Sequence, residues 1–203
     1  MIWSDFYCWV LPSVPGCPNP SLDLHIRQAA IDFCRRTLCW VRTLDPVEAN
    51  GVDIRFDLDL PSQTQAVKLM AVAVNGLEYL LVDTQRGLHL VRQGSGADFS
   101  FTQDKLTLDV HPLRQRGDSI EVDMALAPSF NAGSIETDLA SPYVQEIAQG
   151  ALATLQMMAG VAWSDPGLAV ANKALFNQRV ATVAMHFARG QGAARVVSSR
   201  RYC

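Results

Sequence analysis

The chain has 203 residues, of which 49% are hydrophobic and 18% charged, and its formal net charge is −3. This composition is that of a globular protein and excludes a disordered chain, and the length suits one sizeable domain or two small ones. No apolar run reaches the roughly 20 residues of a membrane span, and the N-terminus lacks the basic start of a signal peptide. We therefore expect a soluble protein made in a cytosol.

The charges are unevenly distributed along the chain. Residues 44–140 hold 15 acidic and 7 basic residues, whereas the remainder holds 5 acidic and 10 basic residues. This uneven distribution of charge indicates that the acidic middle and the basic flanks contact different charged partners.

The N-terminal part of the sequence predicts two helices. Residues 4–10 predict a short helix, which the prolines at 12 and 15 end. After the segment VPGCPNP at 14–20, apolar residues at helical spacing predict a long helix over 21–41. Cys34 and Cys39 lie five residues apart in this pattern, so we expect them not to share a helix face.

The middle of the chain changes to a period of two. In residues 52–60 apolar side chains alternate with charged ones, which predicts a half-buried strand whose outer face carries Asp53, Asp57 and Asp59. Asn75-Gly76 between two apolar runs predicts a tight hairpin. Weaker strands near 87–92, 99–102, 105–110 and 119–127 complete an antiparallel sheet, sandwich or small barrel.

Two further helices are expected after residue 140. Ser141-Pro142 and Asp165-Pro166 are start signals, and the second helix extends to about Arg189. It is apolar on two sides, with Leu168, Leu175 and Met185 on one stripe and Phe176, Val180 and Phe187 on the other. Such a helix is either deeply buried or packed against a neighbouring chain.

The predicted fold is α+β. It consists of a helical bundle built from both chain ends (1–43 and 141–189), an inserted antiparallel β-region (44–140) and an extended C-terminal arm (190–203). The arm contains three arginines and no acidic residue. That is a weak signal for nucleic acid and is equally compatible with docking onto a protein partner.

The sequence contains few patterns that are typical of a catalytic, metal or cofactor site. It contains no phosphate-binding loop, dinucleotide fingerprint or nucleophile elbow. Cys8, Cys17, Cys34 and Cys39 could in principle join His25 around zinc, but the paired short spacings of zinc sites are missing. The three aspartates are spread over roughly 20 Å of strand, too far apart for one calcium ion. We therefore expect no catalytic residue, no metal and no cofactor.

Two segments carry a resemblance to a known family. The first contains the turn and helix residues Pro12, Pro15, Gly16, Cys17, Pro18, Ala29, Ala30, Phe33, Cys34, Arg35 and Thr37. The second contains Gly150, Ala151, Leu152, Leu155, Trp163, Asp165 and Pro166. Together they resemble the head-to-tail adaptor (connector or neck) proteins of tailed bacteriophages. The β-region between them matches in type alone.

The resemblance implies a structural virion protein at the head–tail junction, synthesised in the host cytoplasm and without enzymatic activity. Copies, typically twelve, would form a ring between the portal and the next neck or tail protein, extending a channel through which genomic DNA passes without specific binding. The arm would dock on the portal through the residues Arg195, Val196, Val197, Arg200, Arg201 and Tyr202.

Within this interpretation two further surfaces have roles. Asp53, Asp57 and Asp59 would face the channel or a ring neighbour, because acidic side chains do not hold DNA phosphates as lysine and arginine do. Phe176, Val180 and Phe187 would pack subunits together in the ring. A tail-completion or tail-terminator protein and a metal-dependent enzyme remain alternatives.

Overall fold

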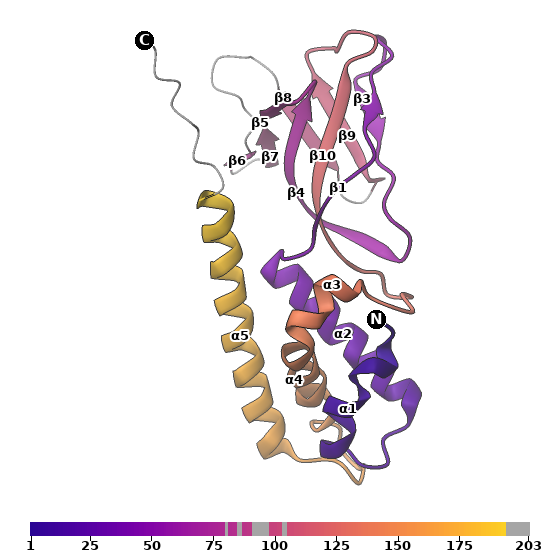
Figure 1. The fold of residues 1–203 in the computed structure, drawn as a ribbon, viewed down its shortest axis with the longest axis vertical. Coiled ribbons are helices and arrows are strands. Elements are labelled where there is room, and N and C mark those ends of the chain that lie inside the picture. Colours follow the sequence, from indigo (N-terminus) through magenta and orange to yellow (C-terminus); the bar gives the residue numbers. More distant parts are fainter. Residues whose placement is uncertain (80, 85–86, 91–97, 103–104, 194–203) are drawn as a thin grey trace. The chain divides into compact units, whose positions relative to one another are not determined.

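The computed structural model describes residues 1–79, 81–84, 87–90, 98–102 and 105–193 (Figure 1). The chain forms two compact units. The helical unit contains Met1–Cys39 and the chain from Ala132 onward, and the β unit is Trp40–Asn131. Helices and antiparallel strands together make an α+β fold, as predicted.

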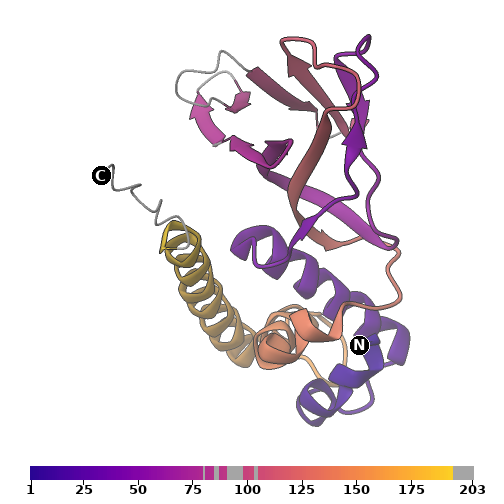
Figure 2. The ribbon, with the colours of Figure 1, turned by 45° about the horizontal axis from the view of Figure 1, so that its top comes forward.

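The helical unit is built around three longer helices, α2 (Asn19–Thr37), α4 (Val144–Leu155) and α5 (Pro166–Ala193). Each of the three contacts the other two, and they lie side by side in both views (Figures 1 and 2). The remaining elements are short: η1 (Trp3–Phe6), α1 (Tyr7–Val10), η2 (Leu11–Ser13), α3 (Thr137–Ala140) and η4 (Ser141–Tyr143).

The predicted start of α5 is confirmed. The Asp165 carboxylate accepts a hydrogen bond from the Leu168 backbone N–H at 3.0 Å, and Pro166 is the first helical residue. A side-chain acceptor before a proline satisfies a backbone donor that the helix itself cannot pair.

Helix α2 ends four residues earlier than predicted. Leu38 adopts a left-handed conformation (φ +53°), and its N–H donates to the Cys34 carbonyl at 2.9 Å. The apolar spacing continues through Cys39 and Trp40, which suggested a longer helix. Trp40 instead belongs to the β unit, where its carbonyl accepts from the Leu126 N–H at 2.7 Å.

The β unit contains two antiparallel sheets. The first has the order β1 (Val41–Thr43), β10 (Ser119–Pro128), β4 (Thr64–Val74), β5 (Leu77–Tyr79), with β2 (Val47–Glu48) also paired to β10. The second has the order β3 (Arg55–Asp57), β9 (Thr107–His111), β8 (Asp98–Thr102), β7 (Gly87–Leu90), β6 (Leu81–Thr84). The predicted hairpin at Asn75-Gly76 is confirmed: both residues have positive φ, and Val74 pairs with Leu77.

The predicted strand over 52–60 is wrong in extent, because β3 covers Arg55–Asp57 alone. The Asn50 side-chain oxygen accepts from the N–H groups of Val52 and Asp53, at 2.9 and 2.8 Å, which makes this stretch a turn. Val52 is accordingly 78% exposed rather than buried, and among the five alternating apolar side chains Phe56 and Leu58 are in the core.

Candidate functional site

The predicted extended arm over 190–203 is wrong at its start, because residues 190–193 are helical and belong to α5. The predicted helix end at about Arg189 is therefore four residues too early. The rest of the predicted arm, residues 194–203, lies outside the described residues. Arg195, Val196, Val197, Arg200, Arg201 and Tyr202 all follow Ala193, the last residue of α5.

The three aspartates predicted to form one acidic face are all exposed. Asp57 is the last residue of β3, whereas Asp53 and Asp59 lie before and after that strand. Asp53 accepts a hydrogen bond from the Asn50 amide. The three carboxylates therefore come from a turn, a strand end and the segment that follows it, and they do not line a single strand face.

An ion pair neutralises part of this region. Arg55 in β3 donates two hydrogen bonds to Asp109 in β9, at 2.7 and 3.1 Å. The Arg55 guanidinium lowers the pKa of Asp109 mainly through this hydrogen bonding. The Arg55 guanidinium is therefore paired with Asp109. The negative charge of the surrounding surface comes from the carboxylates of Asp53, Asp57 and Asp59.

The α5 stripe predicted to pack subunits is largely covered by the chain itself. Phe176 is 1% exposed and Val180 is 2% exposed. The Phe176 ring lies 6.5 Å from the Phe33 ring of α2, and the Arg36 guanidinium lies over it at 5.6 Å. Phe187 is half-buried. Two of these three side chains therefore offer no surface to a neighbour.

The opposite side of α5 remains open. Val170, Ala174, Ala181 and Met185 recur at intervals of four and seven residues, so they share one helix face, which we call the outer face of α5. All four are exposed, with Val170 at 61% and Met185 at 52%. Leu168 and Leu175, which the sequence placed on the same stripe as Met185, are also exposed.

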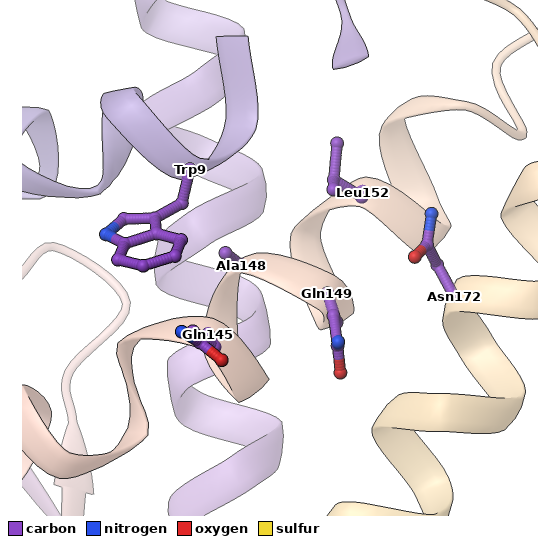
Figure 3. A pocket seen from close by; sticks show the side chains of 6 residues that line it. All are labelled: Trp9, Gln145, Ala148, Gln149, Leu152 and Asn172. Carbon is purple, nitrogen blue, oxygen red and sulfur yellow. The ribbon is translucent and has the colours of Figure 1, made fainter. Parts of the chain in front are cut away.

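A pocket of about 300 Å³ in the helical unit is lined by residues of α1, α4 and α5 (Figure 3). Its lining is Trp9, Gln145, Ala148, Gln149, Leu152 and Asn172. The Trp9 indole is 47% exposed, and the buried Gln149 Oε1 has no hydrogen-bond partner. An aromatic face beside amide groups suits an extended peptide, whose backbone both donates and accepts hydrogen bonds. The sequence did not reveal this pocket, because its residues come from three separate segments.

The Asn172 amide in this pocket is already oriented. It donates to Gln156 Oε1 at 2.9 Å, and Gln156 itself is 1% exposed. A second pocket of about 440 Å³ lies on the α4 side of Trp9 and includes Ser141, Gln145 and Glu146. Trp9 therefore lines two pockets, and the second of them contains the carboxylate of Glu146.

The titratable groups do not gather into a reactive centre. Within the described ranges no three of the histidine, cysteine, aspartate and glutamate side chains are placed to hold a metal ion. His25 bonds to Thr154 at 2.9 Å, and burial lowers its pKa. Cys17 is buried and Cys8 exposed, both as free thiols. Among the described residues, the cysteines and His25 that could in principle have joined around zinc therefore form no such cluster.

Comparison with known proteins adds no family. Neither the protein-family models nor the curated proteins contain a match to this sequence. In the part of the chain that the structure describes, no helix has both the length and the apolarity needed to cross a lipid bilayer.

Proposed function

We propose that this chain is a ring-forming head-to-tail adaptor of a tailed bacteriophage, positioned between the portal and the next neck or tail protein. The observation that carries the proposal is the outer face of α5. A 28-residue helix has one side buried in its own unit and an apolar, small-residue side exposed.

A neighbouring copy is the natural partner for that face. An exposed apolar helix face of this length indicates a contact surface, and the alanines at 174 and 181 allow another helix to approach closely. A ring closes when one surface of each subunit meets a different surface of the next. The outer face of α5 supplies one of these two surfaces.

The residues that carry the family resemblance occupy structurally demanding positions, which supports the proposal. A Cβ on Gly150 would lie 2.8 Å from the Phe176 ring and 3.0 Å from Ala29, so this glycine permits the close approach of α4 to α5 and α2. Asp165 and Pro166 begin α5. In the proposed adaptor the helices from both chain ends form one bundle that carries the β unit as an insertion.

The remaining surfaces have distinct tasks in this proposal. Residues 190–203 dock on the portal, and the exposed carboxylates of Asp53, Asp57 and Asp59 face the channel or a ring neighbour. The Trp9 pocket offers a peptide-binding surface of the kind a downstream neck protein needs. No step of this function requires a metal, a cofactor or a reaction.

The test is to mix the purified chain with portal rings and, separately, with tail tubes of the same virus, and to image both by electron microscopy. The proposal expects a ring, of about twelve copies in this family, attached to the portal. Attachment to the end of the tail tube alone would contradict it and favour a tail-completion or terminator protein. Absence of binding to both would overturn the virion assignment.

A further inference from the structure

The end of α2 brings two thiols together that the helical spacing had separated. Leu38 adopts φ +53° and donates its N–H to the Cys34 carbonyl at 2.9 Å. A left-handed residue at a helix end turns the chain back, so the following residue lies over the last turn. Cys39 follows Leu38 directly, so it lies beside Cys34 at the end of the helix, and the two thiols shift each other's pKa. The expectation that the two cysteines lie on different helix faces assumed a helix through residue 41, and it does not apply because α2 ends at Thr37.

The two thiols differ in environment and in acidity. Cys34 is 1% exposed and Cys39 is 8% exposed. The interaction between the two thiols lowers the pKa of Cys39 and raises the pKa of Cys34, and burial raises the latter further. The thiolate is the reactive form of cysteine. Cys39 is the more exposed of the two and its pKa is the one that is lowered, so Cys39 is the attacking group and Cys34 the resolving one.

We propose that Cys34 and Cys39 form a redox modification site, at which a low-molecular-weight disulfide oxidises both thiols to an intrachain disulfide. The Cys39 thiolate attacks one sulfur of the reagent and releases the other half as a thiolate, leaving a mixed disulfide. The Cys34 thiol then loses its proton and attacks the Cys39 sulfur, which releases the second half. One reagent disulfide is reduced to two thiols, and two protein thiols are oxidised to one disulfide.

The position of the pair suggests what the bond does. Cys39 is the last residue of the helical unit, and Trp40 is the first residue of the β unit. A bond from Cys39 to Cys34 fastens the chain to α2 at the boundary between the units. Access for the reagent requires opening of the last helical turn, which is among the first parts of a helix to unfold locally.

The local sequence makes the test specific. Arg35 and Arg36 lie between the two cysteines, so trypsin separates residues 28–35 from residues 37–42. These two peptides stay joined after digestion when a disulfide links Cys34 to Cys39. The experiment treats the folded full chain with oxidised glutathione, blocks the remaining thiols by alkylation and identifies the tryptic peptides by mass spectrometry.

We expect the joined peptides from the wild-type protein, a rise in its thermal midpoint on oxidation, and reversal of both by dithiothreitol. The matched control is Cys17→Ser, which removes another buried thiol and should leave the joined peptides unchanged. In Cys39→Ser the joined peptides and the rise in thermal midpoint should both be lost.

The exposed Cys8 reports that the reagent is active. If Cys8 acquires glutathione while Cys34 and Cys39 are alkylated only after unfolding, the proposal is overturned. A disulfide from either residue to a different cysteine overturns it as well.

Discussion

At the scale of single residues, Gly150 shows how closely the three long helices approach one another. The nearest atoms to a Cβ at this position would be Phe176 Cε2 at 2.8 Å and the Ala29 Cβ at 3.0 Å. Real Cβ atoms do not approach so closely, and the phenyl ring lies against Phe33 and Arg36. Contact of α4 with both α2 and α5 therefore depends on the absence of a side chain here.

Replacing Gly150 with alanine should destabilise the protein. Overpacking of a filled core typically costs 1–3 kcal/mol, which outweighs the roughly 1 kcal/mol that alanine gains over glycine inside a helix. We expect a lower free energy of unfolding, measured by urea denaturation followed by circular dichroism.

The matched control for that variant is Gly167→Ala near the start of α5. A Cβ there meets Asp165 Oδ1 at 3.4 Å, which is an ordinary contact. Its stability should stay equal to that of the wild type or rise slightly. Equal stability of the Gly150 and Gly167 variants would show that α4 can move away from Phe176 at little cost.

His25 provides a second residue-scale prediction, on pH. The Thr154 hydroxyl donates to the Ala151 carbonyl, so its oxygen accepts the Nδ1–H of neutral His25. Burial lowers the pKa of His25 in the folded protein. As the pH falls below about 6.5 the unfolded state binds the proton first. Stability contributed by neutral His25 is therefore present above that pH and is lost on acidification.

The measurement compares wild type with His25→Gln at pH 7.5 and pH 5.5. Glutamine can still donate a hydrogen bond to Thr154 but does not titrate. The wild type should lose more unfolding free energy between the two pH values than the variant does. Parallel losses would mean that the imidazole is protonated equally well in both states.

At the scale of elements, the sequence predicted helices better than it predicted their ends. Asp165-Pro166 is a local signal, and α5 begins there. The end of α2 depends on the left-handed Leu38, a residue type that gives no such signal. The alternating pattern over 52–60 failed because one side chain, Asn50, turns the backbone before β3 begins.

The outer face of α5 gives an element-scale prediction. Ala181→Glu places a carboxylate in the middle of the proposed subunit contact, where burial of an unpaired charge opposes association. We expect self-association, measured by sedimentation velocity, to weaken at least tenfold. If the subunits assemble on the portal, the occupancy of portal rings, measured by electron microscopy, should fall by the same factor. The helical content should not change, because Ala181 is exposed.

The matched control is Arg179→Glu, which changes the charge more but lies on another side of the same helix. Arg179 is exposed as well. If both variants assemble like the wild type, the outer face of α5 is not the subunit contact.

At the scale of the whole molecule, the alternation of helical and strand periodicity was enough to predict a β-region inserted between helical ends. The structure divides the chain at Cys39 and Ala132, so the segment 132–140, which the sequence assigned to the β-region, belongs to the helical unit. The candidate surfaces were less predictable. The Trp9 pocket and the Cys34–Cys39 pair arise from tertiary packing and from one backbone conformation, and neither has a spacing signature.

The last prediction concerns the arm and the whole protein together. Phe176 and Val180 anchor α5 in the core of the helical unit, so we expect a chain that stops after Ala193 to keep the wild-type circular dichroism spectrum and thermal midpoint. Under the proposed function it should no longer decorate portal rings in electron micrographs.

A full-length variant with Arg195, Arg200 and Arg201 changed to glutamine should bind the portal more weakly, because it loses three charges that can pair with portal carboxylates. Ser198→Ala with Ser199→Ala, in the same segment, should bind as the wild type does. Normal decoration by the truncated chain would show that the portal is held by another surface.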